Sequence, residues 1–477
     1  MFGLPRLLTQ LAFLFVAATL LAAPARKPNV VFIVADDMRP DAPSCFGNTL
    51  IRTPNIDRLA ARGAVFPRAT CSYPICNVSR SEMFAGRVML GPDVERGPGG
   101  GLKFNPTWVL WPEQMKRSGW HTVYTGKWHV GGSPRLDGFM ETAGLFSSGG
   151  GPAGVKATLP TTPTGRAVTG YTGWTFKDEN NQPLPELGVG LTQDTDRIMT
   201  DRATEAIKRM GDRPFFLQVN FTAPHDPLHW PRGKENSIDY RTVSLPANFR
   251  VAPAFDTGNI DGRDEVVVPA PRSEADVKKE RAIYFSEVEN VDVQVGRIVR
   301  ALQEAGQLDQ TIIIFTSDHG LAMGSHGLMG KQNQFEHTIN VPLVLAGPGI
   351  PSGKRFAAQC YLRDLYPTVC ELTGTPIPPS VQSRSLMPVL RGEKAEIHDA
   401  IFGYFTDTQR MVRYADGWKL IWYPRIEKHQ LFQVLDDPDE LRDRSAEPEQ
   451  QTRLQQMKAR LKEWQRHEGD PLLAARE

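Results

Sequence analysis

Four apolar runs in this 477-residue chain end abruptly in charged side chains, and this pattern limits the folds that the chain can adopt. The runs are NVVFIVADD, HTVYTGKWHVGG, PFFLQVNFTAPHDP and TIIIFTSDHG, and a fifth run, VPLVLAGPG, ends in a Gly-Pro turn. Uniformly apolar runs of this length are typical of buried strands in a parallel sheet. Helical segments such as TPNIDRLAARG and EVENVDVQVGRIVRALQEAG separate them. The alternation predicts an α/β fold with a large mixed, mostly parallel sheet sandwiched by helices.

Charged residues stand at the carboxyl ends of these runs, where ligands bind in such sheets. Asp36 and Asp37 follow the first run, and Asp318 and His319 follow the fourth. Each pair alone is also compatible with a solvated turn. If the two strands are neighbours, three carboxylates and one imidazole converge, and this oxygen-rich set suits Ca²⁺ or Mg²⁺. Because imidazole is a softer ligand than Ca²⁺ prefers, a transition metal is an alternative.

Basic side chains follow the other runs. Lys127 and His129 follow the second run, His225 follows the third, and Lys331 lies beyond the fourth. A lone lysine or histidine is usually a surface or core group. Together with a metal ion and Arg80, however, these side chains predict a pocket for a compact oxyanion such as a sulfate or phosphate ester.

The first 25 residues, MFGLPRLLTQLAFLFVAATLLAAPA, combine a basic Arg6, an apolar stretch and a small-residue cleavage site. This pattern predicts a signal peptide over residues 1–25, and an exported protein that is periplasmic or secreted. A transmembrane anchor is the alternative, but the apolar stretch is short for a bilayer. We expect no stable membrane insertion. The formal net charge of +1 gives no field that would attract nucleic acid, so none is expected as a partner.

The sequence pattern changes near residue 388. Short apolar strands with turns, followed by a charged helix from Pro448 to His467, predict a small C-terminal antiparallel sheet with a helix. We therefore expect a catalytic domain over residues 26–387 and a C-terminal subdomain over residues 388–477. Gly91–Thr107 and Thr142–Thr195 are rich in Gly, Pro and Thr, which predicts long surface loops.

The chain has five cysteines, and in an exported protein an odd number leaves one unpaired. Cys45–Cys71 and Cys360–Cys370 are candidate disulfides, although free buried thiols are an equal alternative. Cys76 stands among polar residues in CNVSRSEMFAGR. A thiol close to a cation and a helix start is the environment in which cysteine does chemistry.

Six segments, taken together and in this order, resemble the type I sulfatases of the alkaline-phosphatase superfamily, and most closely their iduronate-sulfatase-like branch. The segments are VADDMRP, TPNIDRLAARGAVF, CNVSRSEMFAGR, TGKWHVGG, APHDP and FTSDHGLAMGSHGLMGK. The family signature is Cys-x-Pro-Ser-Arg followed by a small-Gly exit, and it is matched by Cys76, Ser79, Arg80 and Gly86. The resemblance implies a sulfuric ester hydrolase.

The resemblance also implies a modified nucleophile and a metal. A formylglycine-generating enzyme would oxidise Cys76 to formylglycine during export. One hydroxyl of the hydrated aldehyde then attacks sulfur, and the second expels sulfate. The implied metal is Ca²⁺, with Mg²⁺ as the alternative. Its implied ligands are Asp36, Asp37, Cys76, Asp318 and His319.

The resemblance further assigns roles to the basic residues. Arg80 would orient the diol, and Lys127, His225 and Lys331 would contact the sulfate oxygens. His225 is the leading candidate to protonate the leaving oxygen. His129 would take a proton from the hydroxyl that expels sulfate.

Two residues depart from the family pattern. Val78 replaces the signature proline, which bears on recognition by the modifying enzyme. His319 replaces the asparagine of many members, although the iduronate-like branch carries histidine there; this bears on the identity of the metal.

A helix that begins near Ser79 is expected to direct its positive end towards the anion.

We therefore expect hydrolysis of sulfate esters, on a sulfated saccharide or polysaccharide. Tyr171 and Trp174 are expected to stack on a sugar ring at the rim of the site. A phosphodiester or phosphonate hydrolase on the same scaffold is one alternative, and an inactive glycan-binding homologue with an unmodified Cys76 is another. The sequence does not identify the sugar, the sulfated position, endo or exo action, or the oligomeric state.

Overall fold

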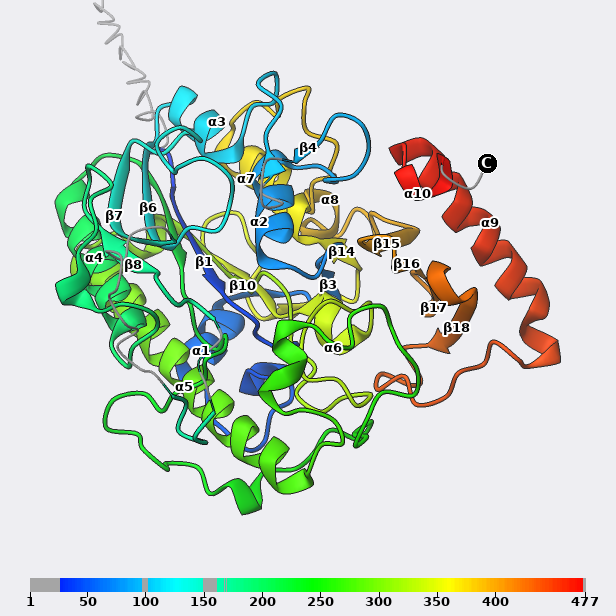
Figure 1. The fold of residues 1–477 in the computed structure, drawn as a ribbon. Helices are drawn as coiled ribbons and strands as arrows, with labels where there is room; N and C mark the ends of the chain where they lie inside the picture. The colour runs from blue at the N-terminus through cyan, green and yellow to red at the C-terminus, as the bar shows by residue number, and fades with distance from the viewer. Residues whose placement is uncertain (1–25, 97–101, 149–160, 167, 169, 475–477) are drawn as a thin grey trace, which may run out of the picture.

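The computed structural model describes residues 26–96, 102–148, 161–166, 168 and 170–474. The expected signal peptide, residues 1–25, therefore lies outside the described residues. A nine-stranded sheet forms the centre of the molecule, with the order β13-β2-β12-β10-β1-β9-β6-β7-β8 (Figure 1). Its strands are β1 (Asn29–Ala35), β2 (Gly63–Val65), β6 (His121–Lys127), β7 (Glu141–Ser147), β8 (Thr175–Lys177), β9 (Phe215–Asn220), β10 (Thr311–Ser317), β12 (Leu343–Ala346) and β13 (Lys354–Arg355).

Strand β1 lies between β10 and β9 and is parallel to both, so that Ala35 is opposite Ser317. Strand β6 is parallel to β9 on the other side. The carboxyl ends of all four predicted strands therefore meet at one edge of the sheet. Strand β12, from the VPLVLAGPG run, is antiparallel to β10. The expectation of a mixed, mostly parallel sheet is confirmed.

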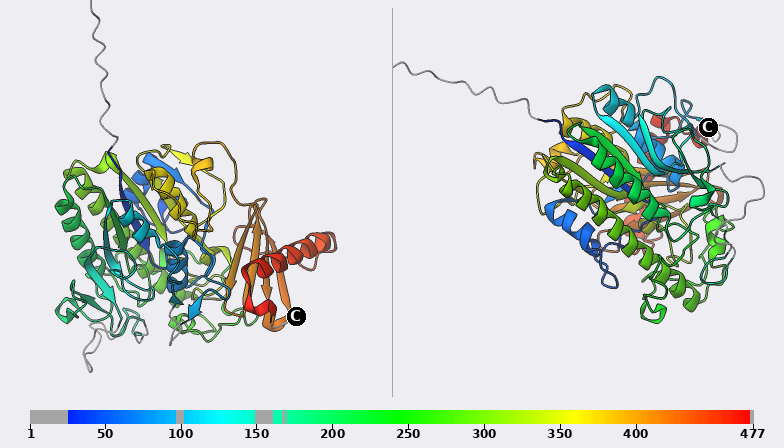
Figure 2. Two further views of the ribbon diagram at one scale, coloured as in Figure 1. Left: turned by 90° about the horizontal axis from the view of Figure 1, so that it is seen from above. Right: turned by 90° about the vertical axis from the view of Figure 1, so that its left-hand side faces the viewer.

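Helices cover both faces of the sheet (Figure 2). On β1, Val31 and Ile33 belong to the core shared with α1 (Pro54–Arg62), α4 (Thr195–Met210) and α5 (Glu274–Glu304), whereas Val30 and Phe32 belong to the opposite core. That second core contains α2 (Cys76–Ala85), α3 (Trp111–Arg117), α7 (Leu365–Thr373) and α8 (Met387–Leu390). Because both faces of β1 are buried, its sequence is apolar at every position from Val30 to Ala35 rather than at alternate ones.

The C-terminal region forms the antiparallel sheet that the sequence predicts. Its strands are β15 (Ala400–Phe405), β16 (Gln409–Tyr414), β17 (Trp418–Tyr423) and β18 (Lys428–Gln433). Helix α9 (Gln451–Glu468) packs on this sheet, where Trp464 stacks on Phe402 with ring centroids 5.1 Å apart (Figures 1 and 2). A short helix, α10 (Pro471–Ala474), follows. The boundary at residue 388 between two domains stays a prediction.

The remaining elements are short. Strands β3 (Ala69–Thr70), β11 (Asn340–Val341) and β14 (Cys360–Tyr361) form a small sheet, and β4 (Glu95–Arg96) pairs with β5 (Leu102–Lys103). Helix α6 (Glu336–Ile339) has a single turn. None of the helices in the described part of the chain is long and apolar enough to cross a membrane.

Three expectations need correction or refinement. The predicted loop Thr142–Thr195 begins inside β7 and contains β8, because buried Leu145 and Phe146 extend the central sheet beyond β6; the predicted loop Gly91–Thr107 contains β4 and β5. Helix α5 begins at Glu274, 13 residues before the predicted helical segment, where the Ser273 side chain caps it. All five cysteines are free thiols, so neither candidate disulfide is formed.

Candidate active site

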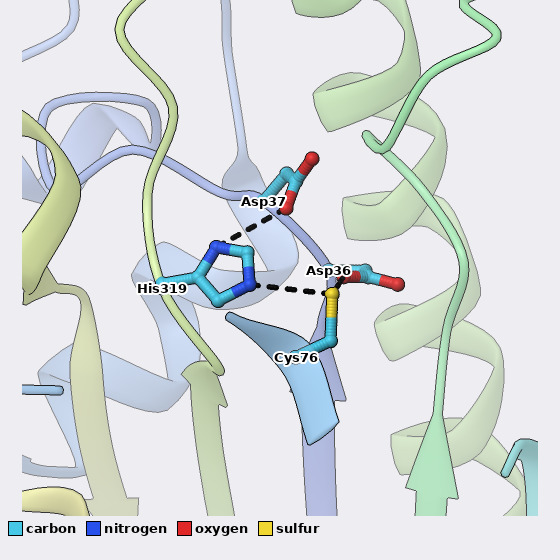
Figure 3. A group of neighbouring side chains, drawn as sticks. All are labelled: Asp36, Asp37, Cys76 and His319. Carbon is cyan, nitrogen blue, oxygen red and sulfur yellow. Dashed lines mark hydrogen bonds and ion pairs between the residues drawn. The ribbon is translucent and has the colours of Figure 1, made fainter. Parts of the chain in front are cut away.

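The candidate active site lies where β1, β10 and α2 meet. Asp36 and Asp37 directly follow β1, His319 lies two residues after β10, and Cys76 is the first residue of α2. Their ligand atoms lie within 4.8 Å of one another, and all four side chains are buried (Figure 3). His319 Nε2 is 3.3 Å from Cys76 Sγ, and His319 Nδ1 is 3.1 Å from Asp37 Oδ1. The chain thus brings together donors that are far apart in sequence.

Asp318 borders this group but does not belong to it in the described geometry. Its Oδ1 accepts hydrogen bonds from the backbone N–H groups of Asp37 (3.3 Å) and His319 (3.0 Å). Its Oδ2 accepts from Arg80 Nε at 2.9 Å. Asp318 therefore fixes the positions of its neighbours, and its role as a fifth metal ligand stays a prediction.

The backbone at Asp37 is strained in the way that functional sites often are. Its φ of 67° is left-handed, which costs a residue with a side chain about 1–2 kcal/mol. The Tyr284 hydroxyl holds this turn, because it donates to the Asp37 carbonyl at 2.9 Å and accepts from the Arg39 N–H at 2.8 Å.

Helix α2 presents Cys76 to the site. The helix begins at Cys76, three residues earlier than the sequence suggested, and its first ladder bond runs from the Ser79 N–H to the Ile75 carbonyl at 3.0 Å. The Ser79 hydroxyl donates to the Asp318 carbonyl at 2.7 Å, which ties the helix to β10. The unpaired N–H groups of a helix start favour an anion. Gly86 ends the helix at φ 64°, where a Cβ atom would lie 2.9 Å from Val381 Cγ1.

Two buried lysines flank the carboxylates. Lys331 Nζ lies 2.8 and 2.9 Å from the two oxygens of Asp37 and 2.8 Å from His225 Nε2, and Lys127 Nζ bonds to Asp36 Oδ2. A cavity of about 240 Å³ opens beside them. Its lining brings together the predicted residues Cys76, Lys127, His129, His225 and Lys331. The sixth, Arg80, lies beneath, with its guanidinium 1% exposed.

Charges determine the protonation of these groups. Burial opposes ionisation of Cys76, but Lys127, Lys331 and His319 lower the pKa of its thiol well below the usual value. Burial raises the pKa of Asp37 to about 6, and it also raises the pKa of Asp318. The lysines, histidines and Arg80 therefore do not fully offset the cost of burying these carboxylates. A donor set of buried carboxylate oxygens and one imidazole fits a divalent cation.

The two histidines of the cavity differ in electrostatic environment. Although burial favours the neutral ring, the carboxylates of Asp37 and Asp226 raise the pKa of His225 to about 10. For His129, burial lowers the pKa of the ring below its ordinary value, and the nearby Cys76 and Asp36 do not offset this effect. A protonated and a neutral imidazole therefore face the same cavity.

The structure adds residues to the site and corrects the place of one that the sequence predicts at its rim. Tyr171 is 7% exposed and lies inside the site rather than at its rim, with its hydroxyl donating to Asp36 Oδ2 at 2.8 Å. Asp226 Oδ1 lies 3.0 Å from His225 Nδ1. Arg263 and Asp264 complete one wall of the cavity. Asp226 stands in the APHDP segment and could have been found there. The sequence predicts Tyr171 as a stacking group at the rim and not as a partner of Asp36, and nothing in the pattern around Arg263 marks that residue.

A family model described as Sulfatase matches residues 28–375, and a model described as N-sulphoglucosamine sulphohydrolase, C-terminal, matches residues 324–467. The chain belongs to the sulfatase family. This sulfatase is 28% identical over 439 residues to the arylsulfatase of Clostridium perfringens, covering 87% of this chain and 89% of that protein. It is 27% identical over 398 residues to human iduronate 2-sulfatase, covering 74% and 70% of the two chains. The resemblance found in the sequence is confirmed, and the protein is a sulfuric ester hydrolase.

Solved structures share the fold of this sulfatase. BT4656 in complex with its substrate D-glucosamine-2-N,6-O-disulfate superposes with a TM-score of 0.72 at 20% identity, covering 93% of this chain and 98% of that chain. The phosphonate monoester hydrolase SpPMH from Silicibacter pomeroyi gives 0.73 at 19% identity, covering 94% and 97%. Because both activities occur on this scaffold, the fold alone does not choose between sulfur and phosphorus esters.

Proposed function

We propose that this sulfatase hydrolyses sulfate esters of saccharides through a formylglycine derived from Cys76, with the help of one divalent cation. The observation that carries the proposal is the position of Cys76. Its Sγ lies at a helix start, 3.3 Å from His319 Nε2 and 3.4 Å from Asp36 Oδ1, and its residue lines the cavity with both lysines. A structural cysteine gains nothing from such surroundings.

The cation is proposed to be Ca²⁺, with Mg²⁺ as the alternative, because most of the donors are carboxylate oxygens. It would polarise the sulfate and stabilise the charge that develops on its oxygens. The proposed ligands are Asp36, Asp37, Asp318, His319 and the modified residue 76. Lys127 and Lys331, which now pair with Asp36 and Asp37, would then turn their charge to the substrate.

The sulfur of Cys76 stands in for the oxygens that the modified residue would carry. Arg80 is suited to hold them, because it is fixed by Asp318 and its Nη1 has no hydrogen-bond partner among the described residues, although it is buried. The first N–H groups of α2 add positive potential from the same direction. These donors would orient one oxygen towards sulfur and stabilise its charge.

Proton transfers are assigned from the two imidazoles. His225 directs Nδ1 to Asp226 and Nε2 to Lys331 Nζ at 2.8 Å. Once Lys331 turns to the substrate, Nε2 would hold a proton for the leaving oxygen. His129 is neutral and lines the cavity with residue 76, so it would accept the proton released when sulfate departs. An acid and a base set apart by their environments are typical of hydrolases.

Sulfate is preferred over phosphate in this proposal because the matching family model and the named relatives are sulfatases. The relatives named for iduronate and the neighbour bound to a sulfated glucosamine support a saccharide as substrate.

The test requires protein made together with a formylglycine-generating enzyme, the proposed maturation partner. We expect the peptide that contains Cys76 to show the mass of the aldehyde, and Cys76→Ala to lose turnover with its fold intact. Cys71→Ala is the matched control, because Cys71 is a buried cysteine five positions away and lies outside the cavity. Near-native activity of Cys76→Ala, or faster hydrolysis of phosphate or phosphonate esters than of sulfate esters, contradicts the proposal. Export through residues 1–25 stays a prediction.

A further inference from the structure

One part of the cavity lining, called the wall below, contains groups that the proposed chemistry does not use. They are Trp174, Arg263, Asp264 and Gln332. Since catalysis assigns them no task, and since they line the same cavity as Cys76 and the two lysines, they are placed to contact the alcohol part of the ester. A cavity of about 240 Å³ has room for one small ring, below the range usual for drug-sized ligands.

The guanidinium of Arg263 donates hydrogen bonds to two carboxylates. Its Nε donates to Asp264 Oδ1 at 2.7 Å, and its Nη2 donates to Asp226 Oδ1 at 3.0 Å. Asp264 is only 4% exposed and Asp226 only 7%, so water does not replace these bonds. An anionic group of a substrate would have to compete with both carboxylates for this one cation.

The other cations near these carboxylates already have partners. His225 Nδ1 lies 3.0 Å from Asp226 Oδ1. Lys331 Nζ is 3.8 Å from Asp264 Oδ2, but it already contacts Asp37 at 2.8 Å and is the group that faces the sulfate. A substrate carboxylate placed here would therefore face Asp264 at close range, and its partner would be Nη1 of Arg263, whose charge Asp226 and Asp264 already share. Burial makes such an encounter costly.

A hydroxyl group finds a better environment at the same wall. Asp264 is an acceptor, and Arg263 Nη1 is a donor to which no hydrogen bond is assigned among the described residues. Each hydroxyl can both donate and accept, so neighbouring hydroxyls of a sugar match such an alternating pair. Trp174 is half-buried and held edge-to-face against His129 at 5.4 Å and Tyr171 at 4.8 Å, which leaves an aromatic surface for the apolar face of a ring.

We infer that Trp174, Arg263 and Asp264 form a subsite for a sugar ring that carries no charge besides its sulfate, so that neutral sugar sulfates are preferred over sulfated uronic acids. This inference rests on the proposed function, which it narrows to a substrate class. By this inference the chain differs from human iduronate 2-sulfatase in its preferred substrate, although both proteins belong to the sulfatase family.

The test compares two panels of monosulfated sugars, one of neutral hexoses and N-acetylhexosamines and one of hexuronic acids, each sulfated at every ring position in turn, with an aryl sulfate as reference. For the wild-type enzyme we expect the best neutral sugar to exceed the best uronic acid by about tenfold or more in kcat/KM, as expected for one unscreened charge at close range. Equal or faster turnover of a uronic acid overturns the inference.

Three variants test whether Asp264 causes this substrate preference. Asp264→Asn is expected to reduce the ratio of neutral to acidic substrate by about tenfold, whereas Asp264→Glu keeps the charge and the ratio. Asp309→Asn is the matched control; it removes the same charge from a side chain that is 92% exposed and lies at the other end of β10. An unchanged ratio in folded Asp264→Asn overturns the role of Asp264, and if that variant does not fold, the wild-type comparison still decides. Hydrolysis of the aryl sulfate alone overturns the sugar subsite, and a lack of activity on every sulfate ester overturns the proposed function itself.

Discussion

Replacing Tyr171 by phenylalanine tests whether the cation site is built around Asp36. The Tyr171 hydroxyl donates to Asp36 Oδ2 at 2.8 Å, and the carboxylate is 0% exposed, so no water takes its place. A hydrogen bond to a charged group contributes about 1.5–3 kcal/mol. Asp36 keeps Lys127 as a partner, so we expect a folded variant that is destabilised by about this amount.

The same loss is expected to weaken the binding of the cation. Removing a hydrogen-bond partner of a metal ligand lowers metal affinity by about 10- to 100-fold. Calcium titration followed by calorimetry measures this affinity, and urea unfolding of the metal-free protein measures stability separately. The ring of Tyr171 keeps its contacts with Trp174 and His225 in the variant, so packing changes little.

Tyr404→Phe is the matched control for this experiment. Its hydroxyl donates to a buried carboxylate, Glu82 Oε1, at a similar 2.9 Å, but Glu82 is not one of the grouped ligands. We expect Tyr404→Phe to lose similar stability and to bind calcium like the wild type. If Tyr171→Phe loses stability but keeps full calcium affinity, Asp36 does not hold the cation and the site as proposed is wrong.

Three further predictions concern other residues. Asp318→Ala leaves Arg80 without its closest counter-charge in a buried site, so it should lose about 3–5 kcal/mol of stability and its bound metal together; full metal occupancy in a folded variant, by elemental analysis, contradicts this. His129→Ala should release the alcohol in a burst and then turn over about 10²- to 10⁴-fold more slowly, because the base for sulfate release is missing; stopped-flow kinetics without a burst would move His129 to substrate binding. Burial raises the pKa of Asp137 to about 7 against 3.8 in the unfolded chain, so the free energy of unfolding falls as the pH rises between these values. Asp137→Asn should therefore raise the Tm at pH 8 and have little effect at pH 4, and equal shifts at both pH values would refute the assignment.

The sequence predicted the parts of the site that are carried by regular strands. Uniformly apolar runs identify strands buried on both faces, and the charged residues that follow them necessarily meet at one edge once β10, β1, β9 and β6 are neighbours. For this reason the sequence alone predicts that Asp36, Asp37 and His319 lie together if their two strands are neighbours.

Residues on irregular segments could not be predicted in this way. Tyr171 lies in an irregular segment, and Arg263 is the first residue of a short 3-10 helix, Arg263–Val267. Their positions follow from how two long connections fold over the sheet. The same limit explains why Tyr171 was expected at the rim. No periodicity indicates whether a side chain in a connection points outward or inward, and here its hydroxyl reaches Asp36.

The structure also explains why valine is accommodated at position 78. Val78 is the third residue of α2, and the first four N–H groups of a helix have no partner within it. The ladder of this helix begins with the N–H of Ser79. A proline at position 78 would therefore lose no ladder bond, and valine there keeps the same backbone while its side chain, 2% exposed, joins the core.

The central position of β1 in the sheet has a consequence for the synthesis of the protein on the ribosome. Its neighbours in the sheet begin at Phe215 and Thr311, so the strand NVVFIVA leaves the ribosome long before either partner exists. At about 5–20 residues per second, the roughly 180 residues up to β9 take about 9–36 s to synthesise. Throughout that interval the apolar segment Val30–Ala35 has neither neighbouring strand to pair with. We expect it to be the main chaperone-binding segment of the nascent chain, and the first to aggregate when translation is slowed.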